Sequence, residues 1–140
     1  MSDLSFEVFL GRIEVIRGKS TREDDNVWRI TIDRFKPEVT IVTGLFRTAN
    51  KDGIGRILAH GVIVSREDGN DMPSVEDLKE SVIFRNCVEA IYDTARRSLN
   101  AQAATMDFSF DLPIRSPKAE IRMKNRTEPG VASPKLTSQK

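Results

Sequence analysis

The 140-residue sequence contains one cysteine, Cys87, and one histidine, His60. One cysteine excludes an intramolecular disulfide, and one histidine excludes the paired histidines of many metal sites. No apolar run is long enough to span a bilayer, and the N-terminal stretch lacks the basic start and continuous apolar run of a signal peptide. We therefore expect a protein of the reducing cytoplasm that holds no metal or other cofactor and is not inserted in a membrane.

An excess of charge of one sign is also missing, because 22 Lys and Arg residues are balanced by 21 Asp and Glu residues. A net charge of +1 indicates neither a nucleic acid nor an acidic partner. Only residues 115–140 are biased, with seven basic residues against two glutamates. No aromatic residue interleaves these charges to stack on bases, so we expect a solvated, disordered tail and no nucleic-acid binding. Residues 1–114 form the single expected domain.

Apolar and polar residues alternate in four segments, residues 4–17, 27–35, 38–48 and 54–66, which predicts four β-strands. Gly11 lies where the first segment changes phase, which suits a β-bulge. The turn at residues 50–53 ends in Gly53, which we expect at positive φ. Short turns between the later segments predict an antiparallel meander.

The third and fourth strands carry apolar side chains on both faces, such as Ile41 and Val42, or Val62 and Ile63. A small antiparallel sheet usually leaves one face to water. One helix can cover only one face, so the other face needs another subunit, a client chain or the C-terminal segment. This pattern predicts a homo-oligomer.

A long amphipathic helix is predicted next, over residues 75–99. Ser74 is a suitable N-cap, with Asp77 three residues later. Apolar or small residues recur every three or four positions at Leu78, Val82, Ile83, Cys87, Ala90, Ile91, Thr94 and Ala95. Phe84, Val88 and Tyr92 form a second apolar edge, which predicts that the helix contacts more than its own sheet. A Phe-rich extended segment, residues 106–114, follows the helix.

No arrangement of side chains predicts catalysis. Cys87 lies on the apolar stripe of the helix, where a small core residue is the simpler interpretation. A cysteine nucleophile would need a base, and His60 would have to reach it from the fourth strand. The glycines Gly53 and Gly55 lack the lysine and further glycine of a phosphate-binding loop. We expect a protein that is not an enzyme.

These elements predict an α+β fold: a four-stranded antiparallel β-meander packed against one long C-terminal helix, a short extended segment and a flexible tail. Several short motifs over residues 56–110 follow this order. They are His60-Gly61-Val62-Ile63-Val64 at the end of the sheet, an acidic helical stretch from Ser74 to Glu80, Ser81-Val82-Ile83-Phe84 opening the main helix, then Glu89, Ile91 and Arg97, and finally Ser109-Phe110. In this register the chain resembles the SecB family of protein-export chaperones.

The resemblance implies an ATP-independent holdase that binds non-native polypeptides for export or for delivery to a specific partner. Its partners would be unfolded or precursor polypeptides, the SecA motor or an antitoxin, and its assembly a tetramer built as a dimer of dimers. We expect the client-binding surface to include Phe35, Phe46, Phe84, Tyr92 and Phe108. The alternative from the residues alone is a small non-enzymatic adaptor or inhibitor that binds one folded protein.

Overall fold

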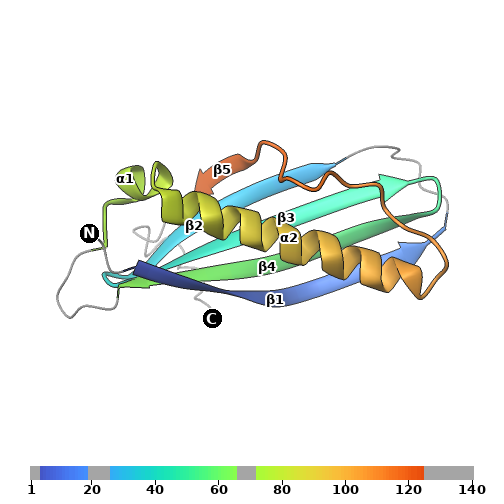
Figure 1. The fold of residues 1–140 in the computed structure, drawn as a ribbon, viewed down its shortest axis with the longest axis horizontal. Helices are drawn as coiled ribbons and strands as arrows, with labels where there is room; N and C mark the ends of the chain where they lie inside the picture. Colours follow the sequence, from blue (N-terminus) through green and yellow to red (C-terminus); the bar gives the residue numbers. More distant parts are fainter. Residues whose placement is uncertain (1–3, 19–25, 66–71, 125–140) are drawn as a thin grey trace, which may run out of the picture.

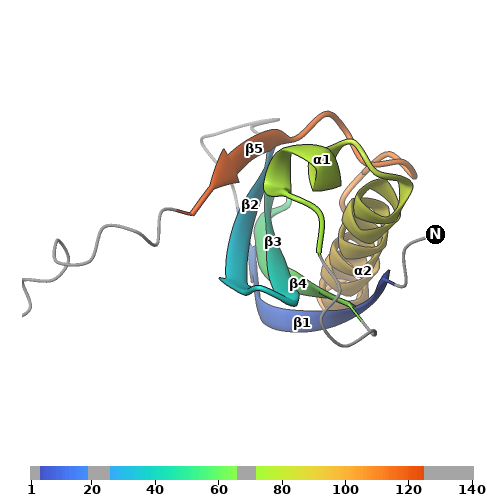
Figure 2. The same ribbon diagram turned by 90° about the vertical axis from the view of Figure 1, so that its left-hand side faces the viewer.

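The computed structural model describes residues 4–18, 26–65 and 72–124. They form strands β1 (Leu4–Arg17), β2 (Val27–Lys36), β3 (Val39–Asn50), β4 (Gly53–Ser65) and β5 (Glu120–Met123), and helices α1 (Val75–Lys79) and α2 (Val82–Ala104). The strands make one mixed sheet in the order β1-β4-β3-β2-β5, antiparallel except for β5, which runs parallel to β2. Helix α2 lies along one face of the sheet (Figure 1), and the sheet bends around the helix (Figure 2). The predicted α+β class is confirmed.

The four predicted strands are found within two residues of their expected ends. The register of β1 against β4 shifts between Leu10 and Arg12, which confirms the bulge at Gly11. The expected positive φ at Gly53 is wrong, because among the described glycines only Gly18 has one. A Cβ at Gly53 would lie 2.6 Å from the Phe108 ring and from the Ile16 carbonyl oxygen. Close packing is therefore what requires a glycine there.

The predicted number of four strands is also wrong, because a fifth strand, β5, lies inside the segment expected to be a disordered tail. Residues 120–123 alternate in polarity, but four residues surrounded by Pro, Ser and Lys do not indicate a strand by themselves. Pairing with the edge of β2 makes the strand. The sheet therefore continues past residue 114, and the remaining part of the predicted tail, residues 125–140, lies outside the described residues.

The predicted single helix over residues 75–99 is interrupted and longer than expected. Ser74 caps α1 by accepting a hydrogen bond from the Asp77 N–H at 3.1 Å. The chain leaves the helix at Glu80, and Ser81 caps α2 by accepting one from the Phe84 N–H at 3.2 Å. Each serine oxygen satisfies an N–H that has no partner within the helix. A second N-cap therefore divides the region into the short and long helices that the resemblance implied.

The core lies between α2 and the inner face of the sheet. Trp28, Phe46 and Tyr92 meet edge to face, with ring centroids 5.5 to 5.9 Å apart. The helix comes very close to the sheet at Gly61, where a Cβ would overlap the Cys87 sulfur. The aliphatic part of the core is formed by Ile30, Ile32, Val42, Ile57, Ile63, Leu78, Ile91 and Leu99.

Residues 105–119, here called the return segment, run back from the end of α2 toward β5 (Figure 1). Phe108 and Phe110 stack edge to face at 5.1 Å, and the Phe110 N–H donates to Asn100 Oδ1 at 2.7 Å. The Tyr92 hydroxyl donates to the Pro113 carbonyl at 2.7 Å. The prediction that the helix contacts more than its own sheet is therefore confirmed. On the side that carries Tyr92, α2 contacts the return segment of the same chain.

Candidate peptide-binding grooves

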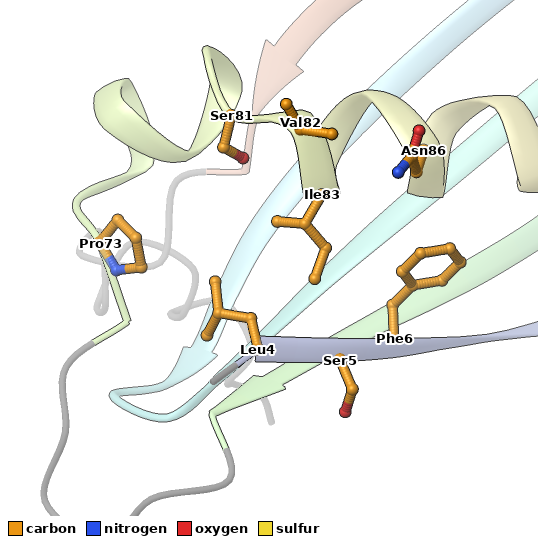
Figure 3. Close-up of a pocket in the computed structure, with 8 residues that line it drawn as sticks. All are labelled: Leu4, Ser5, Phe6, Pro73, Ser81, Val82, Ile83 and Asn86. Atoms are coloured by element: carbon orange, nitrogen blue, oxygen red, sulfur yellow. The ribbon is translucent and has the colours of Figure 1, made fainter. Parts of the chain in front are cut away.

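A groove of about 600 Å³ opens between the first residues of β1 and the first turns of α2. Leu4 and Phe6 point from β1 toward the helix, and Ile83 points from the helix toward β1 (Figure 3). Ser5, the residue between them, points to the other face of the sheet (Figure 3). Pro73, Ser81, Val82 and Asn86 complete the lining. We call this the β1 groove.

The β1 groove lies beside a long edge of the sheet. Within the described residues the 14-residue β1 is an edge strand, which pairs with β4 on one side only. Apolar side chains are exposed near this edge, at Phe9, Leu10 and Val82, the last with 60% of its surface open to solvent. An unpaired edge next to an apolar groove suits an extended peptide, because backbone hydrogen bonds and side-chain burial are available together.

A second groove, of about 410 Å³, lies on the other flank of α2, beside β5. We call it the β5 groove. Its floor is apolar and includes Ile30, Phe84 and Val88. Its wall comes from the end of the return segment, where Ser116 donates two hydrogen bonds to the Glu89 carboxylate. The sheet edge at this groove is occupied by β5, whereas no described strand lies beyond β1 at the opposite edge.

Groups of opposite charge lie at both ends of β5. Glu120 Oε1 lies 3.3 Å from Arg29 Nε on β2, and Lys124 Nζ lies 4.0 Å from Asp33 Oδ2. Hydrogen bonds from Arg122 and then from Arg29 hold the pKa of the Glu120 carboxyl below its usual range. Both ends of β5 are thus tied to β2 by groups of opposite charge.

The five predicted client-binding residues do not gather on one surface. Phe46, Phe84 and Tyr92 are buried, with exposed fractions of 1%, 3% and 0%, because they pack between α2, the sheet and the return segment. Phe108 is half-buried against the same core. Phe35 is exposed at the end of β2, where the register against β3 shifts. Phe46, Phe84 and Tyr92 are core residues in this conformation, and contact of these five residues with a client stays a prediction.

The residues that do line the β1 groove were missed as site residues. Val82 and Ile83 were assigned to the buried stripe of the helix, and Leu4 and Phe6 to an ordinary strand. The signal that could have found them is the strand order, because it leaves β1 at an edge. Strand order depends on long-range pairing, and local alternation does not reveal it.

Cys87 and His60 lie on opposite faces of the sheet. Cys87 faces the inner side of β4 at Gly61, and burial raises the pKa of its thiol to about 12. The neighbouring residue His60 points to the outer face, where its Nδ1 lies 2.9 Å from the Thr43 hydroxyl. The histidine cannot activate the thiol across the sheet. Within residues 4–18, 26–65 and 72–124, no group of three metal-ligating side chains comes together.

None of the helices in the described part of the chain has the length and apolar character needed to cross a membrane. The described residues thus form an α+β fold in which a five-stranded mixed sheet bends around one long helix, with a groove beside the β1 edge.

The chain is similar in structure to the Mycobacterium tuberculosis Rv1957 SecB-like chaperone, solved in complex with a ChAD peptide from the Rv1956 HigA1 antitoxin. The TM-score is 0.61, the sequence identity is 14%, and the match covers 81% of this chain and 88% of that chain. At this identity the similarity shows the fold. No protein-family model and no curated protein matches the sequence.

Proposed function

We propose that the protein is an ATP-independent chaperone that holds extended segments of non-native polypeptides in the β1 groove. The observation that carries the proposal is the coincidence, in the described part of the chain, of the 14-residue edge strand β1 with an apolar groove of about 600 Å³. The similar fold of a SecB-like chaperone solved with an antitoxin peptide supports it. Export, or delivery to one partner such as an antitoxin, is the purpose we propose for this binding in the cytoplasm.

The physics of such binding is non-specific. Backbone N–H and C=O groups of β1 would pair with any extended chain, and Leu4, Phe6, Val82 and Ile83 would take its apolar side chains. Burial of apolar area contributes about 25 cal/mol for each Å² removed from water. No particular client sequence is required, which is what a holdase needs.

We further propose that the protein catalyses no reaction. The thiol of Cys87 is buried and faces away from His60, which leaves it without a base. A specific observation keeps an adaptor as the second candidate. Apolar side chains about half exposed on the sheet, such as Phe9, Leu10 and Ile16, would also suit contact with one folded partner.

Self-association is also part of the proposal. The outer face of the sheet, on the side away from α2, carries Val39, Ile41, Leu45, Leu58, Val62 and Val64, which are only half-buried. Phe9 and Ile16 of β1 lie on the same face with about half of their surface exposed. Apolar patches of this kind usually mark an interaction surface. A dimer of dimers is the assembly that the SecB resemblance implies.

The direct test is suppression of aggregation. We expect the protein to keep a chemically unfolded model protein soluble on dilution, without ATP. Val82→Glu should weaken this activity about tenfold or more, because a buried valine contributes about 1.5–3 kcal/mol and each 1.4 kcal/mol is a factor of ten. Val82 is exposed, so the variant should fold normally. Ile114→Glu is the matched control, since Ile114 is exposed outside the β1 groove.

Failure of the unmodified protein to suppress aggregation at stoichiometric excess would contradict the proposal. Binding to one native protein without affinity for unfolded chains would favour the adaptor. Equal loss of activity in the Val82 and Ile114 variants would place binding outside the β1 groove.

A further inference from the structure

Strand β5 covers only part of the outer edge of β2. Its four residues, Glu120–Met123, pair in parallel with residues 29–32 of the ten-residue β2. One further hydrogen bond follows, from the Lys124 N–H to the Ile32 carbonyl at 2.8 Å. Figures 1 and 2 both show β5 beside β2 at the edge of the sheet. The chain thus adds a short strand to an edge that would otherwise be free.

Strand β5 is only weakly attached to the rest of the sheet. All four of its residues are exposed, including Ile121 and Met123, which keep 45% and 49% of their surface open to solvent. The ion pair of Glu120 with Arg29 is open to solvent, where such pairs contribute little, and Lys124 Nζ lies 4.0 Å from the buried Asp33 carboxylate, which is too far for a close hydrogen-bonded pair. A strand held in this way contributes no residue to the buried core.

The surface beside β5 suits an incoming chain. The β5 groove has a volume of about 410 Å³ and an apolar floor that includes Ile30 and Phe84, both nearly fully buried. Residues 116–119 and Ile121 form one of its walls, so their departure would widen the groove and free the edge of β2. The result would be an edge with an adjacent apolar groove, as at β1.

We propose that the outer edge of β2 is a second docking edge for an extended polypeptide, and that residues 116–124 occupy it as an intramolecular competitor. The chain's own segment defines the chemistry of the occupant. A carboxylate lies opposite Arg29, apolar residues take alternate positions over the helix side, and an ammonium lies near Asp33. The inference rests on the proposed function only in taking the natural occupant to be a non-native polypeptide.

Two full-length variants change the occupancy in opposite directions. Ile121→Asp should release β5, with Ile114→Asp as the matched control because Ile114 is exposed outside the strand. The pair Thr31→Cys and Arg122→Cys, at opposed positions of β2 and β5, should lock the strand when oxidised. The probes are a labelled peptide of the sequence RSPKAEIRMK, which is residues 115–124, a scrambled peptide of the same composition, and reduced, carboxymethylated lactalbumin.

We expect the peptide to bind the Ile121→Asp protein at least about fivefold more tightly than the unmodified or Ile114→Asp protein, because a larger share of molecules has a free edge. The oxidised double-cysteine protein should bind it at least about fivefold more weakly than its reduced form. Equal affinities across these proteins, or equal binding of the scrambled peptide, would overturn the inference. If Ile121→Asp does not fold, the comparison of oxidised with reduced protein decides alone.

The lactalbumin probe separates this inference from the proposed function. Peptide binding that responds to the variants while lactalbumin binds none of them supports the docking edge and contradicts the chaperone proposal. Lactalbumin binding that is identical in the locked and released proteins, with no response of the peptide, overturns the docking edge and leaves the β1 groove as the binding site.

Discussion

At the scale of single residues, the contact between Gly61 and Cys87 sets how closely α2 approaches the sheet. A Cβ on Gly61 would overlap the Cys87 sulfur and would lie 3.1 Å from Ile91 Cδ1. Close-packed interiors yield little to an added methyl group. At this point of contact the separation of helix and sheet therefore depends on one glycine and one small side chain.

Gly61→Ala should lower the free energy of unfolding by about 1–3 kcal/mol, the usual cost of overpacking. Cys87→Ala removes the sulfur and should restore part of the loss, so the double variant should be more stable than the two single effects predict when added. Urea denaturation, followed by the fluorescence of Trp28, the only tryptophan, measures the free energy of unfolding of the single and double variants. Additive effects would show that the two residues are not in contact.

The buried thiol also makes stability depend on pH. Burial raises the pKa of Cys87 to about 12, above its ordinary value of 9.0. Above pH 9 the unfolded chain loses the thiol proton and the folded chain keeps it. The contribution of the thiol to the free energy of unfolding is therefore fully present below pH 9 and is lost as pH rises toward 12. The slope is roughly 1.4 kcal/mol for each pH unit. The free energy of unfolding, measured from pH 8 to 11, should fall less steeply with pH for Cys87→Ala than for the unmodified protein. An identical dependence on pH in the two proteins would refute the assignment of this effect to Cys87.

Residue patterns predicted the sheet core better than the surface of the helix. Alternation placed Trp28, Ile30 and Ile32 on one face, and all three are buried. Phe84 and Tyr92 were expected at a second, outward edge of the helix because 3.6-residue periodicity describes faces and says nothing about what covers them. The return segment covers that edge, and its path is set by contacts more than twenty residues apart, such as Tyr92 to Pro113.

At the scale of elements, the return segment links α2 to the far edge of the sheet. It passes from the end of α2 along the helix, with the Tyr92 hydroxyl bond near its middle and β5 at its end. The predicted meander is confirmed for β2, β3 and β4 and is wrong for β1, which pairs with β4 and not with β2. The place of β1 and the existence of β5 could not be predicted, because both depend on pairing between distant segments. The spans of β1 to β4 could be predicted, because each contains its own alternation.

Tyr92→Phe should loosen the return segment without altering the fold. Loss of one hydrogen bond costs about 0.5–1.5 kcal/mol. The Pro113 carbonyl is on an exposed residue and can be solvated, so the lower value is expected. Limited trypsin digestion should cut after Arg115 faster than in the unmodified protein. Asp111→Asn, an exposed change on the same segment, is the control, and an unchanged rate for Tyr92→Phe would contradict the role of the hydroxyl.

At the scale of the whole molecule, one face of the sheet is closed by α2 and the other is apolar and only half covered. Sedimentation at increasing protein concentration should therefore show dimers or tetramers. Phe9→Lys, which adds charge to the exposed outer face, should shift the population toward monomers. A monomer at all concentrations would contradict self-association through this face.

The central claim is that non-native chains bind beside the first turns of α2. A photo-crosslinking side chain in place of Val82 tests it directly, with Gln102 as the control position. Both residues are exposed on α2, and twenty residues of helix separate them by about 30 Å. We predict crosslinks from position 82 to reduced, carboxymethylated lactalbumin, few from position 102, and none to native lactalbumin. Equal crosslinking from both positions, or crosslinking to the native protein alone, would contradict the account.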